Sequence, residues 1–382
     1  MKKSNRRKFL GDSLASGALV FGSLFSTLAN ASTGKQAHNE GAKIPHKAMN
    51  PSKEARLNAS KNPFGLVYEN AIGKNEKGKV NLQKVSYKTR GLKAVANLYT
   101  PANFTASGKY PAIVVAHPNG GVKEQVAGLY AQKLAEMDYI ALAFDALYQG
   151  QSEGSPRNVD TPSNRVEDIR AAIDFLETFK GVDSSRIGIL GICGGGGYTL
   201  KAAQGDKRLK AIATLSMFNT GRVRRNGFLD SEKDSIQARL EEASRARRQQ
   251  VLGNILYTSE APKKLSKAEL AKISTDLYRE AAEYYGDTHA HPNASFAYTT
   301  ASLLELMSFD CCETIELINK PLLLMVGNRA DTAYMSEEAY EKASGASELF
   351  RLKDSTHIQT YYKKEVVAEA LAKLEAFYKA NL

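Results

Sequence analysis

Short apolar runs alternate with helix-like segments from residue 80 to the end of the chain. Some apolar runs are continuous, such as the AIVVA of 112–116, and are typical of strands covered on both faces. In 165–180, by contrast, apolar residues recur every three or four positions, which indicates one buried face of a helix. This pattern predicts strands at 80–89, 92–99, 112–116, 139–144, 186–190, 211–215, 321–326 and 348–352, and helices at 126–137, 165–180, 198–204 and 364–382.

Strands that alternate with helices in this way predict an α/β fold with a doubly wound, mostly parallel sheet. The first two strands are separated only by the turn at Arg90-Gly91, so they are expected to form an antiparallel hairpin at the edge of the sheet.

One segment interrupts the alternation. Residues 219–310 carry 13 basic and 13 acidic residues, read as largely helical, and fall between two predicted strands. A structureless loop of that length is unusual in a compact domain. We therefore expect a helical cap inserted over the carboxyl edge of the sheet.

The first 31 residues have the pattern of an export signal. The basic start includes Arg6-Arg7 followed by Phe9-Leu10, then a diluted apolar run, and it ends in Ala29-Asn30-Ala31. Paired arginines before such a run resemble a twin-arginine signal, and A-x-A is typical of a cleavage site. We expect cleavage after Ala31 and a periplasmic or otherwise exported protein, with an uncleaved membrane anchor as the alternative.

Composition and charge narrow the class of protein. The chain has 382 residues, 43% of them hydrophobic, and only three cysteines, which excludes a disordered chain and a disulfide-stapled scaffold. Its net charge of +11 suggests an anionic partner, but residues 1–79 hold 14 basic and 5 acidic residues, against 38 and 36 in 80–382. The body is almost neutral, so nucleic-acid binding is not expected. Residues 32–79 are predicted to be a polar lead-in with one short helix near 51–60.

A candidate nucleophile follows the strand at 186–190. The sequence Gly191-Ile192-Cys193-Gly194-Gly195 has the G-x-C-x-G spacing of a nucleophile elbow, with cysteine in the place of the usual serine. The glycines leave room for a sharp turn, and the following helix directs its N-terminus at Cys193, which favours a thiolate. A glycine-rich phosphate loop and an inert buried cysteine are the alternatives, and neither explains this spacing of glycines.

An acid and a base follow in the order expected of a catalytic triad. Asp331 comes after the strand at 321–326, and His357 comes one loop after the strand at 348–352. His357 is expected to accept the thiol proton while Asp331 orients the imidazole. Asp354 is a rival acid, but three residues before His357 it is poorly placed to reach the far ring nitrogen.

An oxyanion hole is predicted from two backbone amides. One is the N–H of Gly194, and the other is expected in the loop His117-Pro118-Asn119-Gly120-Gly121, where we favour Asn119 over Gly120. His117 is expected to be structural.

Other chemically suggestive residues have weaker support. Cys311-Cys312 are expected to be two buried thiols, although a vicinal disulfide is conceivable. His289 and His291 are expected in a cap loop and not in a metal site. The residues from Asp145 and Tyr148 to Ser152 either line the site or, as we favour, shape the loop after their strand. Arg222, Arg224 and Arg225 either attract an anionic substrate or form a solvated basic face.

These motifs together resemble the α/β-hydrolase superfamily, and within it the dienelactone-hydrolase-like branch, whose elbow is G-x-C-x-G. The likeness covers residues 80–382, and the runs 117–125 and 144–150 are similar to a subgroup of uncharacterised bacterial hydrolases. Two positions depart from that subgroup: Asn119 stands where glycine is usual, and no acid follows His357 by two positions.

The sequence therefore predicts a hydrolase that cleaves an ester, thioester or lactone through a cysteinyl acyl-enzyme. An acyltransferase, a peptidase or a non-catalytic binding protein on the same scaffold are the alternatives. No cofactor and no metal are expected. The expected partners are a small acyl substrate and the twin-arginine export machinery, and the oligomeric state is left open.

Overall fold

The computed structural model describes residues 50–382. The predicted signal peptide and the first part of the lead-in lie outside the described residues. Within the described part, no helix combines the length and the apolar character needed to cross a membrane.

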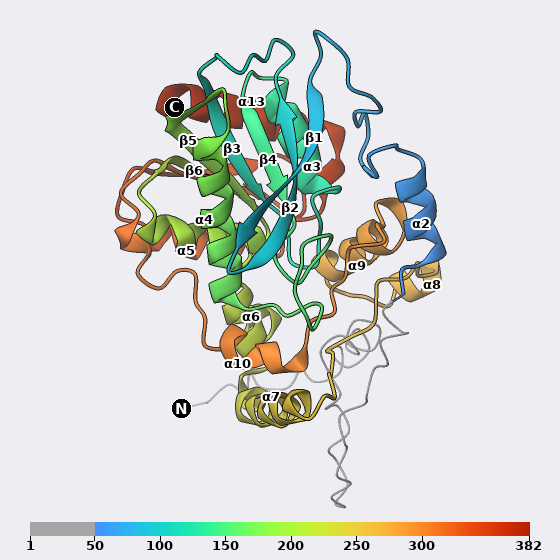
Figure 1. The fold of residues 1–382 in the computed structure, drawn as a ribbon. Helices are drawn as coiled ribbons and strands as arrows, with labels where there is room; N and C mark the ends of the chain where they lie inside the picture. The colour runs from blue at the N-terminus through green and yellow to red at the C-terminus, as the bar shows by residue number, and fades with distance from the viewer. Residues whose placement is uncertain (1–49) are drawn as a thin grey trace, which may run out of the picture.

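An eight-stranded sheet forms the centre of the molecule, in the order β1-β2-β4-β3-β5-β6-β7-β8 (Figure 1). Strand β2 is antiparallel to both β1 and β4, and all other neighbours are parallel. This confirms the mostly parallel sheet and its antiparallel edge hairpin. The strands are β1 (Asn81–Thr89), β2 (Leu92–Thr100), β3 (Tyr110–Ala116), β4 (Ile140–Phe144), β5 (Val182–Ile192), β6 (Leu209–Leu215), β7 (Leu322–Gly327) and β8 (Ser347–Leu352).

Helices cover both faces of the sheet, and this explains why its central strands are apolar throughout. Every residue of β4 and β7 is buried. Helices α4 (Pro162–Thr178) and α5 (Gly194–Gly205) lie on one face, and α3 (Val126–Ala135) and α13 (Lys364–Asn381) lie on the other (Figure 1).

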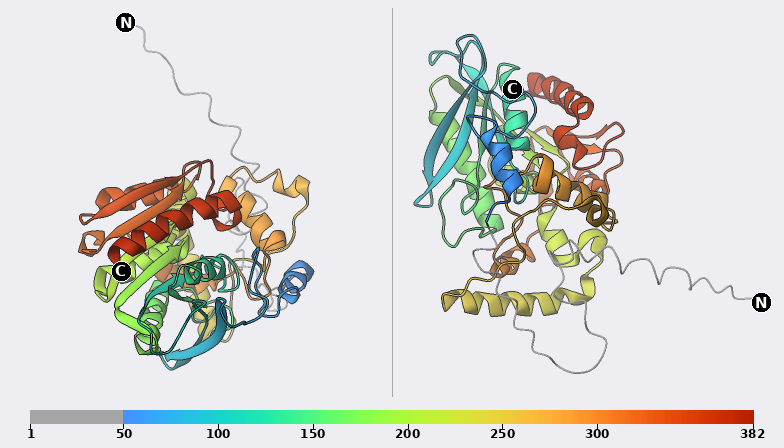
Figure 2. Two further views of the ribbon diagram at one scale, coloured as in Figure 1. Left: turned by 90° about the horizontal axis from the view of Figure 1, so that it is seen from above. Right: turned by 90° about the vertical axis from the view of Figure 1, so that its right-hand side faces the viewer.

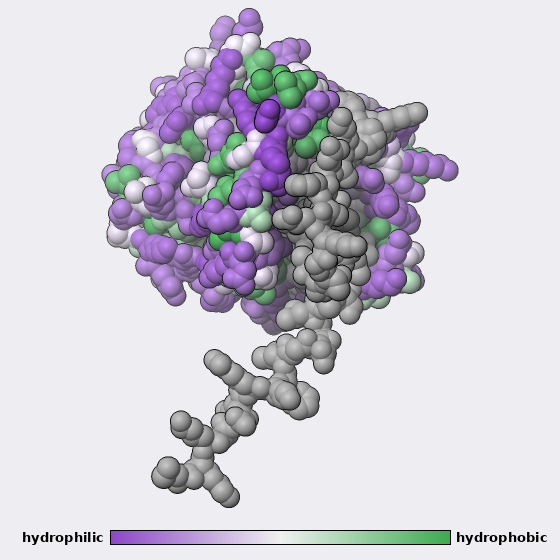
Figure 3. Space-filling model, turned by 90° about the horizontal axis from the view of Figure 1, so that it is seen from below, coloured by the Kyte–Doolittle hydropathy of each residue, from purple (hydrophilic) through white to green (hydrophobic). Residues whose placement is uncertain are grey.

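The segment between β6 and β7 gathers at one end of the sheet, below it in Figure 1, and Figure 2 shows α7 lying across the far end. On the face seen in Figure 3, hydrophilic residues predominate among the described ones and apolar residues are scattered. The helices of this segment are α6 (Thr220–Asn226), α7 (Ile236–Val251), α8 (Lys267–Leu270), α9 (Asp276–Glu283) and α10 (Leu303–Leu306).

The described part of the lead-in packs against the body. Its helix α2 (Lys53–Ser60) occupies the position predicted for a short helix. Tyr68 is buried, and its hydroxyl hydrogen-bonds Gln132 of α3 and lies 3.1 Å from the Tyr99 hydroxyl. This segment is thus part of the folded body and not a detached arm.

The pattern of apolar residues did not predict two of the helices, and it predicted a third helix that is shorter than the one observed. Helices α11 (Ala333–Lys342) and α12 (Gln359–Tyr362) were not predicted. Helix α5 begins at Gly194, four residues before the predicted start, although glycine is a poor helix former. The turn at Cys193 and the packing around it impose the helical conformation on the four glycines.

A cluster of buried charges lies next to the carboxyl ends of β3 and β4. The Lys123 ammonium is fully buried and lies 2.6 Å from both the Asp145 and the Glu124 carboxylates. Burial raises the pKa of Glu124 to about 7, whereas Lys123 and backbone amides outweigh burial and lower the pKa of Asp145. The Asp145 carboxylate also accepts the Gln151 N–H, and its backbone carbonyl accepts the Ser152 hydroxyl. These residues therefore shape the loop after β4.

Replacing Lys123 by methionine should destabilise the fold strongly, because it leaves two buried carboxyl groups without their cation. We expect the free energy of unfolding, measured by urea denaturation, to fall by about 3–5 kcal/mol. The same substitution at Lys133, whose ion pair with Glu136 is partly exposed, is expected to cost less than about 1 kcal/mol. Equal losses in the two variants would contradict this account.

Candidate functional site

Cys193 lies in a sharp turn between β5 and α5. Its backbone has φ 55° and ψ −123°, a conformation that costs energy for any residue with a side chain. Hydrogen bonds to the end of β6 and to the loop after it hold the turn: the Cys193 N–H donates to the Leu215 carbonyl at 3.0 Å, and the Cys193 carbonyl accepts the Phe218 N–H at 2.9 Å. The predicted elbow is therefore present, at the carboxyl edge of the sheet.

The glycines of the elbow are required sterically. A Cβ atom on Gly191 would lie 2.6 Å from the Gly195 carbonyl oxygen, and one on Gly195 would lie 2.4 Å from the Ala116 carbonyl oxygen. Neither contact could be relieved without moving a strand or a helix. This is the close approach that the spacing of the motif predicts.

Two backbone amides face the Cys193 sulfur. They belong to Gly194 and Asn119, and both act to lower the pKa of the thiol. The Asn119 side chain is anchored by a 2.9 Å hydrogen bond from its amide nitrogen to the Thr220 hydroxyl. The two donors proposed for an oxyanion hole thus lie beside the sulfur, one from the nucleophile turn and one from the loop after β3.

The thiolate that the helix N-terminus was expected to favour is not the stable form of Cys193. Burial raises the pKa of the thiol above its ordinary value, and the donors around it offset this only in part. Desolvation of the charged form outweighs the amides and the helix terminus. The site therefore holds a neutral thiol at neutral pH.

His357 lies fully buried within the same site. Its Nδ1 is 2.7 Å from the Thr332 hydroxyl, and its Nε2 is 2.9 Å from the Tyr361 hydroxyl. Burial lowers the pKa of His357 to about 3, so the ring is neutral and can act as a proton acceptor. Among the described residues, the hydrogen-bond partners of both His357 ring nitrogens are hydroxyl groups, and neither partner is a carboxylate or the Cys193 sulfur.

Asp331 is at the predicted place in the chain, but its carboxylate does not bond to His357. Its Oδ2 accepts the Leu277 N–H at 2.9 Å, in the first turn of α9. The N-terminus of a helix has unpaired N–H groups and a positive electrostatic end, and both attract a carboxylate. The expected pairing with His357 thus needs correction: the neighbouring Thr332 orients the imidazole in this structure. The rival acid Asp354 is exposed.

The sequence analysis missed Thr332 and Tyr361. Thr332 directly follows the predicted acid, so the loop was identified but the wrong side chain was chosen. Tyr361 lies four residues after His357, and hydroxyl groups at such positions carry no distinctive sequence signal.

A cavity of about 70 Å³ opens beside the Cys193 sulfur. Its walls are mostly apolar and aromatic and come from the elbow, the loop after β3, the segment after β6, and the loop after β8. Arg224 is the one charged lining residue among those described, and its guanidinium lies 4.8 Å from the centre of the Tyr298 ring. The lining residues are Pro118, Asn119, Cys193, Phe218, Arg224, Thr258, Leu277, Tyr278, Ala281, Tyr285, Phe296, Tyr298, Ile358 and Tyr361.

The other two arginines of this group have structural contacts. Arg222 forms ion pairs with Asp230 and Glu338, and Arg225 donates to the Met307 and Phe309 carbonyls. Only Arg224 of the three therefore reaches the cavity.

His117 is structural, as predicted. Its Nε2 accepts the Ala146 N–H at 3.1 Å, so its Nδ1 carries the proton and donates to the Pro118 carbonyl at 2.7 Å. Burial lowers the pKa of His117 to about 3. The ring joins the loops after β3 and β4 and has no nitrogen left for catalysis.

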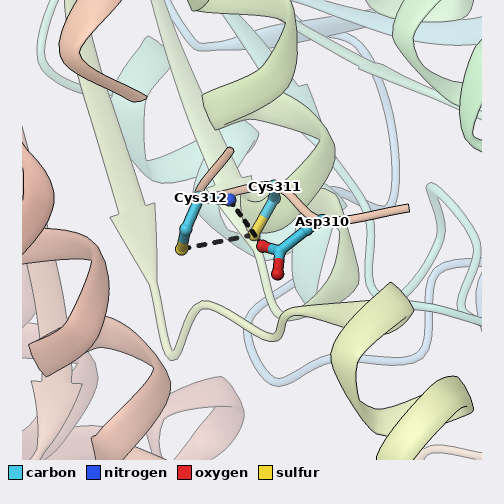
Figure 4. A group of neighbouring side chains, drawn as sticks. All are labelled: Asp310, Cys311 and Cys312. Carbon is cyan, nitrogen blue, oxygen red and sulfur yellow. Dashed lines mark hydrogen bonds between the residues drawn. The ribbon is translucent and has the colours of Figure 1, made fainter. Parts of the chain in front are cut away.

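Cys311 and Cys312 are free, buried thiols, which confirms the prediction (Figure 4). Their sulfur atoms lie 3.9 Å apart, and the Cys312 N–H donates to Asp310. Among the described residues, Asp310, Cys311 and Cys312 form a group whose possible metal-ligand atoms all lie within 4.8 Å of one another. The Asp310 carboxylate is already engaged by the Asn219 side chain at 2.8 Å. His289 instead stacks on Tyr284, in a cap loop as expected.

Comparison with known proteins places this site in a family. The model of the dienelactone hydrolase family matches residues 95–220, which include the loop after β3 and the elbow. The uncharacterized protein YcjY of Escherichia coli is 39% identical over 310 residues, covering 80% of this chain and 99% of that protein.

Two further relatives extend the comparison. A crystal structure of the hypothetical protein PA2218 from Pseudomonas aeruginosa has a TM-score of 0.73 at 33% identity, covering 81% of this chain and 96% of that one. A thiohydrolase of Eupenicillium brefeldianum is 26% identical over 233 residues, covering 60% of this chain and 72% of that protein. With its sheet, its elbow and these relatives, this chain belongs to the dienelactone hydrolase family, and it is an α/β hydrolase that acts on ester-type bonds.

Proposed function

We propose that this protein cleaves an ester, thioester or lactone through an acyl-enzyme formed on Cys193. The observation that carries the proposal is the position of the Cys193 sulfur, held in a strained turn beside two backbone amides and an apolar cavity. This arrangement offers a nucleophile, donors for a developing oxyanion and space for an acyl group.

In the acylation step the Cys193 sulfur attacks the carbonyl carbon, and the electron pair of the C=O bond moves to the oxygen. The N–H groups of Gly194 and Asn119 stabilise that oxygen. His357 takes up the thiol proton and returns it to the leaving group, and it then activates a water molecule that releases the acid. Thr332 holds the imidazole in its orientation during both steps.

The neutral state of the site supports this order of events. A thiol with a raised pKa and an imidazole with a pKa of about 3 do not form a resting ion pair. The proton must therefore move during the attack itself, so general-base assistance is essential to the proposed reaction.

Among the ester-type bonds, thioesters should be tested as substrates, because one relative is named a thiohydrolase. Thioesters also have a better leaving group than alkyl esters. The mostly apolar and aromatic lining of the cavity suits an acyl chain.

Replacing Cys193 by alanine should abolish hydrolysis of p-nitrophenyl acetate and of an S-acetyl thioester. We expect kcat/KM to fall by about 10³-fold or more, because the covalent path is lost. Cys312→Ala is the matched control, since that thiol is buried outside the cavity, and it should keep kcat/KM within about threefold of the wild type. A Cys193→Ala variant as active as the control would refute the proposal.

We further propose that the protein acts outside the cytoplasm, on the basis of the paired arginines and the A-x-A pattern in residues 1–31. Expression in a bacterium with intact twin-arginine export should give a periplasmic protein that begins at Ser32, as read by mass spectrometry of its N-terminal peptide. Replacing Arg6 and Arg7 by lysine should keep it in the cytoplasm. An unchanged distribution of that variant would contradict the proposal.

A further inference from the structure

Tyr361 lies at the centre of the candidate site, although neither its sequence position nor the expected triad indicates a role. It belongs to the short helix α12, is 1% exposed and lines the cavity beside Cys193. Its hydroxyl is 2.9 Å from Nε2 of His357 and also hydrogen-bonds the Cys193 thiol. One hydroxyl thus touches both the nucleophile and the base.

The hydrogen bonds of His357 define what this hydroxyl can do. If Nδ1 carries the ring proton and donates to the Thr332 hydroxyl, Nε2 is free to accept the Tyr361 O–H. The tyrosine oxygen then keeps lone pairs that can accept the thiol proton of the neighbouring Cys193. This gives a continuous path from the thiol proton through the Tyr361 hydroxyl to Nε2.

We propose that Tyr361 is a catalytic residue that carries the proton between Cys193 and His357. The inference rests on the proposed function, because it describes how the acyl-enzyme forms. As the bond from Sγ to the carbonyl carbon forms, the thiol proton passes to the tyrosine oxygen and the original tyrosine proton passes to Nε2. When the bond from the carbonyl carbon to the leaving group breaks, Nε2 gives its proton to the tyrosine oxygen and the tyrosine proton passes to the leaving-group atom, which departs as an alcohol or a thiol. Tyr361 is therefore neutral before and after each step, and no other reactant is needed.

The environment favours a relay over a free tyrosinate. Burial raises the pKa of Tyr361 well above its ordinary value, so its hydroxyl does not give up a proton without receiving another. It also raises the pKa of Cys193 and lowers that of His357, which leaves both neutral in the resting state. Passing two protons together avoids a charged intermediate on the tyrosine.

The hydroxyl can be separated experimentally from the ring. The Tyr361 ring packs edge-on against Tyr284, with 5.5 Å between ring centres, and against His357 at 5.6 Å. Phenylalanine retains these contacts and removes only the relay group. Tyr130 provides a matched control, because its buried hydroxyl donates to the Thr360 carbonyl at 2.8 Å and so supports the same helix without reaching the cavity.

The test measures acylation and thiol ionisation in the wild type, Tyr361→Phe and Tyr130→Phe. Acylation is followed as the first release of nitrophenolate from p-nitrophenyl acetate, and ionisation as the pH dependence of Cys193 alkylation by iodoacetamide. For Tyr361→Phe we expect acylation to slow about 100-fold. Its alkylation profile should move to higher pH, because the Tyr361 hydroxyl turns from Nε2 to donate to the sulfur once the thiol is ionised, and this donation lowers the thiol pKa. Tyr130→Phe should change neither readout by more than about threefold.

A second measurement uses the wild type alone, so its result does not depend on whether the variant folds. If two protons move in one step, the acylation rate should depend on the deuterium fraction of the solvent along a curve, whereas a single transfer gives a straight line. A straight line would overturn the relay.

The outcomes separate this inference from the proposed function. Wild-type acylation and an unshifted pH profile in Tyr361→Phe would overturn the relay and leave Cys193 as the nucleophile. Equal losses in Tyr361→Phe and Tyr130→Phe would show a structural role and also overturn it. If the wild type releases nitrophenolate no faster than Cys193→Ala, the proposed function itself fails.

Discussion

The backbone turn at Cys193 fixes the positions of all the other parts of the site. Its positive φ directs the side chain out of the sheet, and its N–H and carbonyl are hydrogen-bonded to the end of β6 and to the loop after it. Because α5 starts at the next residue, the Gly194 amide is placed beside the sulfur at the same time. The strain in this turn is offset by the packing of the buried central strands around it.

Burial is the second constraint, and it determines the chemistry that the turn can support. His357 is fully buried and Cys193 is partly buried beside the apolar cavity, and the loss of solvation favours the neutral form of both groups. A neutral thiol is a weak nucleophile, so the site needs a proton path that operates during the attack. The Tyr361 hydroxyl beside Nε2 is the proposed path, and the Thr332 hydroxyl beside Nδ1 orients the ring without adding charge.

Much of this architecture could be read from the sequence, because local physics specifies it. Continuous apolar runs predicted the strands, and the glycines at 191 and 195 predicted the elbow, since only glycine permits those close approaches. The chain order of nucleophile and base followed from the connection of the strands. The partner of His357 could not be predicted in the same way. Asp331 is drawn to the N-terminus of α9, which lies more than fifty residues away in the chain and approaches only in the folded protein.

The same limit applies to Tyr361 and to the cap. A tyrosine in a polar loop carries no signal until the fold brings its hydroxyl to a histidine. The helices between β6 and β7 were expected as a group, whereas the cavity they form with Arg224 and the aromatic residues depends on contacts between distant segments. Sequence patterns therefore identify which elements form, while the choice among competing hydrogen-bond partners depends on tertiary structure.

Mass spectrometry of the protein quenched soon after mixing with p-nitrophenyl acetate tests the central claim most directly. The account predicts one acetyl group on the peptide that contains Cys193, appearing before the steady state and absent from Cys193→Ala. Turnover of the ester without any acetylated Cys193, even after quenching at the earliest accessible times, would contradict it.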